Sequence, residues 1–87
     1  MKQVKYNITE EDLIGFLESI LNIEGEISLS DFIERVPSAF DLSDYDLSES
    51  PTRPGECRYE QKCRNIVSHR SFPSNMISYE NQVFRSR

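Results

Sequence analysis

The spacing of apolar side chains in residues 58–70 constrains the fold of this chain more than any other feature. An α-helix turns by about 100° per residue, so a helix over this stretch gathers four apolar side chains on one side. They are Tyr59, Cys63, Ile66 and Val67. This stripe predicts a helix that packs one side against a hydrophobic core, with Tyr59 in that core rather than stacked on a base.

Nitrogen-rich side chains fall on the opposite side of this helix, within an arc of roughly 100°. They are Arg58, Gln61, Lys62, Asn65 and His69. Arg, Lys and His donate to phosphates and base edges, and Gln and Asn can pair with adenine. The arc therefore predicts a DNA recognition helix, with an ordinary amphipathic helix as the alternative. His69 could instead cap the helix C-terminus, and we expect Arg64 to pair with Glu60, four residues earlier.

Two similar helix start signals precede this stretch. Each has an apolar residue, then a hydroxyl side chain that can cap a helix, then an Asp three residues after the cap; the caps are Thr9 and Ser28. They predict a first helix over about 10–22, ended by Gly25, and a second over about 29–36, ended by Pro37. Together with the lead residue Ile8, these helices form the first part of the domain, residues 8–36.

The remaining segments predict a long loop and a hairpin. Residues 37–57 form the loop, in which Ser43 could cap one short helical turn. Residues 76–79 and 82–85 look like two strands joined by a turn at Glu80 and Asn81, and Ile27 could add a short strand to them. This order predicts one α+β, mainly α, domain over residues 1–87. It is the order of a winged helix-turn-helix, with 58–70 as recognition helix and 76–86 as wing.

The formal net charge of −5 is divided unevenly along the chain. Residues 1–50 carry three basic and twelve acidic side chains, whereas residues 51–87 carry seven basic and three acidic ones. Phosphates respond to charge within a Debye length of roughly 8–10 Å, so the basic part remains compatible with duplex DNA, bound weakly and with strong salt dependence. The acidic residues 10–49 favour, as alternatives, a contact with a basic protein partner or a small transcriptional regulator that dimerises through its first helix.

Catalytic and metal-binding patterns are not found. Cys57, Cys63 and His69 are six residues apart, and successive members rotate by about 240° on a helix, so they match no zinc spacing and no catalytic Cys–His pair. A solvated acidic loop explains one further group better than a cation site: Asp41, Asp44, Asp46 and Glu49. We expect no enzyme activity, no cofactor, no metal and no small-molecule substrate.

The cysteines and the hydropathy of the chain bear on its location. Two thiols spaced as Cys57 and Cys63 would lie about 9 Å apart along a helix, too far for a disulfide. No apolar run approaches eighteen residues, and no signal peptide is evident. We therefore expect a protein of the reducing cytoplasm that does not bind membranes.

Residues 54–70 carry a family resemblance. Pro54 and Gly55, followed by the 58–70 stretch and then a hairpin that ends on an aromatic and basic pair, resemble the N-terminal winged-helix domain of Mrr-type restriction endonucleases and related restriction-associated proteins. The resemblance extends over about 10–86. It implies a prokaryotic DNA-binding module, normally fused to a nuclease that cuts modified DNA.

The same resemblance implies roles for individual positions. The DNA contacts would come from Arg58, Gln61, Lys62, Asn65 and His69, with phosphate contacts from Arg53, Arg85 and Arg87. The sequence stops at Arg87, directly after the expected wing, which leaves no room for a nuclease domain. We therefore expect recognition without cleavage, either by a domain of a longer protein or by a stand-alone module with a nuclease or another protein as partner.

Overall fold

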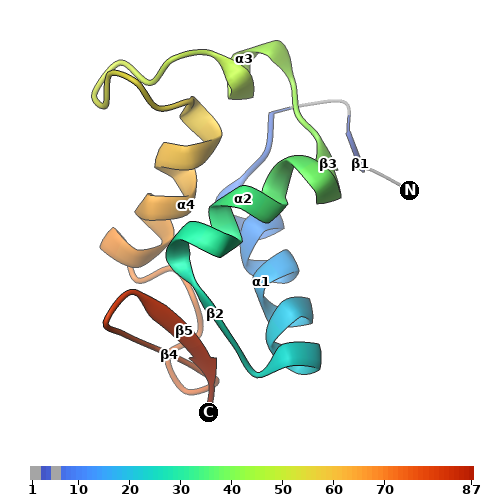
Figure 1. Cartoon of the computed structure of the whole chain (residues 1–87), viewed down its shortest axis with the longest axis vertical. Coiled ribbons are helices and arrows are strands. Elements are labelled where there is room, and N and C mark those ends of the chain that lie inside the picture. Colours follow the sequence, from blue (N-terminus) through green and yellow to red (C-terminus); the bar gives the residue numbers. More distant parts are fainter. Residues whose placement is uncertain (1–2, 5–6) are drawn as a thin grey trace.

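The computed structural model describes residues 3–4 and 7–87 and shows an α+β fold (Figure 1). The expected α+β class is thereby confirmed. The elements, in chain order, are β1 (Gln3–Val4), α1 (Glu10–Glu24), β2 (Glu26–Ser28), α2 (Leu29–Ala39), β3 (Phe40–Asp41), α3 (Asp44–Leu47), α4 (Arg58–Ser68), β4 (Ile77–Glu80) and β5 (Val83–Ser86).

Helix α1 begins and ends where its capping residues predict. The Thr9 hydroxyl accepts a hydrogen bond from the Asp12 amide at 3.1 Å, and the Asp12 carboxylate accepts one from the Thr9 amide at 3.0 Å. Gly25 follows the helix with a φ of 82°, a left-handed conformation that glycine adopts without steric cost. The predicted start is confirmed, and the helix runs two residues beyond the predicted end.

Helix α2 also starts at its predicted cap, where the Ser28 hydroxyl accepts from the Asp31 amide at 3.2 Å. The prediction that Pro37 ends this helix is wrong, because the helix continues through it to Ala39. A proline in the last turn removes one amide donor, and the Phe40 amide still closes that turn on the Val36 carbonyl. Val36 is fully buried, so its packing holds the residue before the proline in helical geometry against the usual preference.

A three-stranded antiparallel sheet has the order β2-β5-β4. Ile27 pairs with Phe84, which confirms the predicted short strand. The predicted hairpin turn is displaced by one residue, since Glu80 pairs with Val83 and the turn is made by Asn81 and Gln82, with φ values of 51° and 61°. Two consecutive positive φ angles are typical of the type I′ turn, whose twist matches that of the strands it joins.

The segment between α2 and α4 contains two short elements. Strand β3 pairs in parallel with β1, and α3 is capped by Ser43, as the sequence predicts. An isolated bridge between Glu49 and Cys57 then closes the loop that leads into α4. Helix α4 ends at Ser68, two residues earlier than predicted, because Arg70 takes a left-handed φ of 52°.

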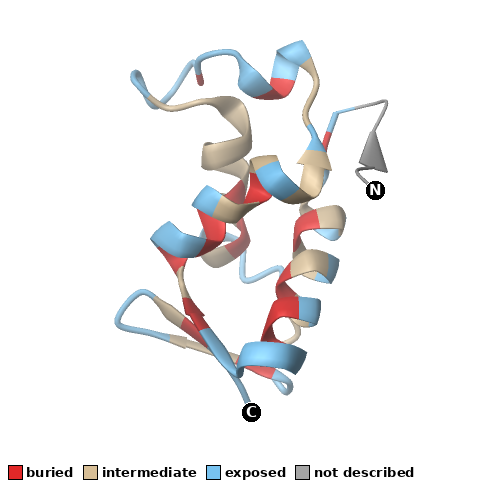
Figure 2. Ribbon diagram, turned by 45° about the vertical axis from the view of Figure 1, so that its right-hand side comes forward, coloured by how far each residue is buried: buried red, intermediate tan, exposed pale blue. Residues whose placement is uncertain are grey.

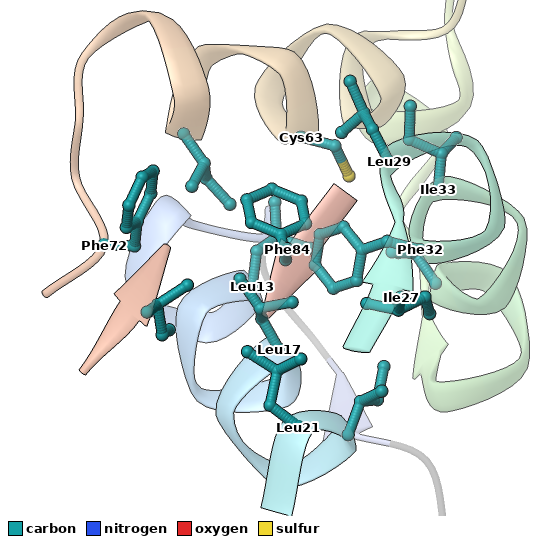
Figure 3. Close-up of a cluster of buried hydrophobic side chains, with 14 of the residues drawn as sticks. Leu13, Leu17, Leu21, Ile27, Leu29, Phe32, Ile33, Cys63, Phe72 and Phe84 are labelled. Carbon is teal, nitrogen blue, oxygen red and sulfur yellow. The ribbon is translucent and has the colours of Figure 1, made fainter. Parts of the chain in front are cut away.

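The hydrophobic core lies between α1, α2, α4 and the sheet, where the buried segments face one another (Figure 2). Phe84 is its central aromatic side chain, with ring centroids 5.9 Å from both Phe32 and Phe72 (Figure 3). Among the residues whose burial the structure describes, fifteen hydrophobic ones are buried in it: Ile8, Leu13, Leu17, Ile20, Leu21, Ile27, Leu29, Phe32, Ile33, Val36, Cys63, Ile66, Phe72, Ile77 and Phe84.

Candidate functional site

Helix α4 packs on α1 and α2 through its apolar side. Cys63 and Ile66 are fully buried, and Tyr59 and Val67 are half-buried against the core. The predicted stripe is thereby confirmed, including the core position of Tyr59.

The nitrogen-rich arc does not lie directly opposite this stripe. Helical geometry places its centre roughly 120° from the stripe, along a flank of α4 that faces α3 and the start of α1. The first four members of the arc are only half-exposed, and His69 is exposed: Arg58, Gln61, Lys62, Asn65 and His69. The expected position directly opposite the stripe is therefore wrong, and neighbouring elements partly cover the arc. The outermost side of the helix combines part of the arc with other residues: Gln61, Arg64, Asn65 and Ser68.

Arg58 is held against α3. Its guanidinium carbon lies 4.3 Å from the centroid of the Tyr45 ring. Its Nη1 donates to the Tyr45 hydroxyl at 2.9 Å, and its Nε donates to Ser48 Oγ at 3.1 Å. A cation stacked on an aromatic face and bonded to two hydroxyls keeps its full charge while its orientation is fixed.

The other members of the arc near α3 are less constrained. The side-chain oxygen of Gln61 accepts a hydrogen bond from the buried Ser50 hydroxyl. Lys62 and Asn65 make no side-chain hydrogen bond or ion pair with the described residues. A shallow concavity of about 130 Å³ lies at the boundary of α3 and α4. Its lining residues are Tyr45, Arg58, Gln61, Lys62 and Asn65.

Three other predicted DNA contacts are engaged by carboxylates of the chain. His69 Nδ1 lies 3.1 Å from Glu10 Oε2, Arg85 pairs with Glu26 at 2.9 Å, and Arg53 pairs with Glu56 at 2.8 Å. His69 is the C-cap residue of α4, as one of the two alternatives expects: its backbone amide donates to the Asn65 carbonyl at 2.8 Å, and its side chain contacts the first turn of α1. Arg87 is exposed at the end of β5.

Arg64 pairs with Glu56 rather than with Glu60, contrary to the prediction. Its Nη2 lies 2.8 Å from Glu56 Oε2, and this pairing, together with Arg53, lowers the pKa of the Glu56 carboxyl. Glu60 instead accepts a hydrogen bond from the Cys57 amide at 2.7 Å, as an acid three residues beyond a helix cap often does. The pairing of Glu56 with Arg64 depends on how the loop closes, which helical spacing alone does not reveal.

Asp46 is not part of a solvated acidic loop. It is 1% exposed, and its Oδ2 accepts from the Ile8 amide at 2.9 Å and from the Ser43 amide at 3.4 Å. Its Oδ1 has no hydrogen-bond partner among the described residues. Asp46 therefore connects α3 to the segment before α1, and the cap spacing from Ser43 to Asp46 is the signal that could have identified it.

The cysteines are free thiols at positions of different burial. Burial raises the pKa of the Cys63 thiol to about 12, and burial also raises the pKa of Cys57. Within residues 3–4 and 7–87, no three His, Cys, Asp or Glu side chains form a group that could hold a metal ion. No helix in this part of the chain is long and apolar enough to cross a membrane.

A second concavity, of about 420 Å³, lies between α1 and β3. Phe16 and Phe40 form an edge-to-face pair in its wall, with ring centroids 5.6 Å apart. Its lining residues are Glu11, Asp12, Gly15, Phe16, Ser19, Ala39 and Phe40. Every ionisable residue in this set is acidic.

Comparison of the chain with protein-family models, with curated protein sequences and with solved structures finds no match.

Proposed function

We propose that the chain is a winged-helix module that docks on duplex DNA. In such a module, the third main helix enters the major groove and the hairpin lies along the backbone. The observation that carries the proposal is the order α1-β2-α2-α4-β4-β5 together with the strand order β2-β5-β4. This arrangement brings the hairpin turn to the same side of the molecule as α4 (Figure 1).

Contacts to base edges are assigned to the outermost side of α4. Gln61 and Asn65 carry amides, which can pair bidentately with adenine, and Asn65 has no side-chain partner to release first among the described residues. Lys62 is assigned a phosphate, because a compact ammonium positions a protein on DNA without selecting a sequence. His69, Arg53 and Arg85 would each have to leave a carboxylate, so they contribute less.

The wider role proposed is that of the DNA-recognition part of a restriction-endonuclease-like protein. It is supported by the resemblance of residues 54–70 to the N-terminal domain of Mrr-type enzymes. No catalytic role is assigned to the described residues, so cleavage would come from another domain or a partner.

Binding of the chain to a pool of mixed-sequence duplexes at two salt concentrations tests this function. Lys62→Ala should weaken binding to all sequences and reduce the salt slope by about one. Asn65→Ala should instead relax the preference at one base pair, at a cost of about 1–3 kcal/mol. Arg35→Ala is the matched control, because it removes the same charge from α2, where Arg35 pairs with Glu24. Binding that neither α4 variant alters would exclude α4 from the interface.

A protein contact is the second candidate function, favoured by the acidic concavity between α1 and β3. Its apolar wall and carboxylate rim suit a partner segment with an apolar side chain followed by Lys or Arg. Glu11→Lys should then abolish binding of a basic partner. Glu34→Lys, an equal charge reversal at an exposed position of α2, should not. Equal effects of the two reversals would indicate general charge attraction and no defined groove.

A further inference from the structure

We propose that the concavity between α3 and α4 is a phosphate site, filled in the DNA complex by one backbone phosphate. The inference rests on the proposed function for the source of the phosphate, a duplex. The oxyanion chemistry itself follows from the side chains that line the concavity: Tyr45, Arg58, Gln61, Lys62 and Asn65.

The orientation of Arg58 favours an oxyanion ligand. Two of its five N–H groups donate to the Tyr45 and Ser48 hydroxyls, and the Tyr45 ring supports the guanidinium plane at 4.3 Å. Three N–H groups therefore remain for a ligand. A fixed, planar fork of donors matches the oxygens of a phosphate and loses little side-chain freedom on binding.

The lining of the concavity contains no carboxylate to balance its positive charge. The chain carries fifteen acidic and ten basic side chains, so a concavity without a carboxylate in its lining is unusual for its surface. Arg58 is bonded to neutral hydroxyls, and Lys62, one helical turn further along α4, adds a second positive charge. Neither cation pairs with a carboxylate of the described residues. Two uncompensated cations at one concavity favour an anion.

The contrast with the other basic side chains sharpens the assignment. Arg35, Arg53, Arg64 and Arg85 each pair with a glutamate at 3 Å or less. Arg70 and Arg87 are exposed but line none of the concavities described above. Converging, uncompensated cations therefore occur, in the described part of the chain, at the boundary of α3 and α4.

The concavity is small, about 130 Å³, and open to solvent. One phosphate group, with its sugar and base outside the concavity, suits these dimensions and the two cations in the lining. Tyr45 is then a positioning residue, which acts through Arg58.

The test uses the full chain, labelled with ¹⁵N, titrated separately with inorganic phosphate and with a mixed-sequence duplex. Both probes should shift the Arg58 Nη2–H resonance and the Lys62 and Asn65 backbone amides. Tyr45→Leu, which leaves the net charge unchanged, should weaken duplex binding by about two- to fivefold, as expected for loss of a cation–π support. Arg58→Gln should reduce the salt slope by about one, whereas Arg58→Lys should keep the slope and lose affinity.

The outcomes separate this inference from the proposed function. A duplex that binds with the same salt slope in Arg58→Gln, and without shifts at the three resonances, overturns the phosphate site and leaves DNA docking intact. Phosphate-induced shifts without any duplex binding overturn the proposed function and uphold an anion site that takes a free phosphate. Because Tyr45 is 49% exposed, its variant should remain folded, and an unchanged thermal midpoint verifies this.

Discussion

The two halves of this molecule are held by different forces. Among the residues whose burial the structure describes, the fifteen buried hydrophobic ones lie outside the connection of residues 40–57, whereas the two buried polar ones, Asp46 and Ser50, lie within it. The helices and sheet are thus stabilised by apolar packing, which is non-directional. In the connection, Phe40 and Leu42 pack against the core, and the rest is held by caps and ion pairs, which are directional. The ion pairs also depend on pH. Since this connection supplies Tyr45 to the candidate site, the site depends on polar contacts more than the scaffold does.

The largest expected effect is on the packed half, which comprises the helices and the sheet outside residues 40–57. Phe84→Ala should lower the free energy of unfolding by about 3–5 kcal/mol, because it leaves a cavity among Phe32, Phe72 and Tyr79. For a chain of this length, that loss approaches the whole stability. Urea unfolding followed by circular dichroism measures it. In the connection, Leu47→Ala is the control, and its 49% exposure limits the expected loss to about 0.5 kcal/mol. Similar losses in both variants would contradict the division.

Removal of the buried Asp46 carboxylate tests the polar half, which is the connection of residues 40–57. Asp46→Ala should destabilise the fold by about 1–3 kcal/mol, because the Ile8 and Ser43 amides lose their acceptor. Hydrogen exchange at Ile8 should accelerate with it, while exchange in the sheet should change only through global stability. A loss as large as that of Phe84→Ala would show that the connection is integral to the core.

The ion pairs of Glu56 make the stability of the connection depend on pH. The pairing with Arg64 and Arg53 lowers the pKa of Glu56 below its ordinary value of 4.5. A lowered folded-state pKa stabilises the fold above about pH 4.5, and this stabilisation is lost as the pH falls through the folded-state pKa. Glu56→Gln should therefore cost about 1 kcal/mol at pH 7 and less at about pH 2. Unfolding free energies of both proteins at the two pH values measure the difference. A constant difference would mean that the carboxylate charge is unimportant.

The same division explains how much could be predicted from the sequence. The packed half follows local rules: Thr9 and Ser28 cap their helices, Gly25 ends α1, and Ile27 lies in a strand. Such signals depend on neighbours within a few residues, so one sequence suffices. The prediction that Pro37 ends α2 is wrong because the packing of the buried Val36 outweighs the preference of a residue before proline for non-helical backbone angles.

The candidate site could be predicted only in part. Helical spacing grouped Arg58, Gln61, Lys62 and Asn65 correctly, and these four line one concavity. It could not show that Tyr45 would cover Arg58, because the two lie thirteen positions apart in the sequence with a loop between them. It also could not show that His69 would meet Glu10 on α1. Long-range polar partners depend on how loops close, and no local pattern records that.

The smallest expected effect concerns the hairpin, where a local rule is broken within the packed half. Gln82 holds a φ of 61° in the second position of its turn, a conformation that costs a residue with a side chain roughly 1 kcal/mol. Asn-Gly is the preferred pair for such a turn, so Gln82→Gly should raise the free energy of unfolding by about 0.5 kcal/mol after the entropy of glycine is deducted. The Gln82 carbonyl that accepts from the Leu29 amide at 2.9 Å is kept. Asn81→Gly is the control and should gain less, since Asn tolerates its φ of 51°. A gain in the thermal midpoint for Gln82→Gly alone would place the strain at this residue. A loss would show that the Gln82 side chain stabilises the hairpin, so that directional contacts also contribute to the packed half.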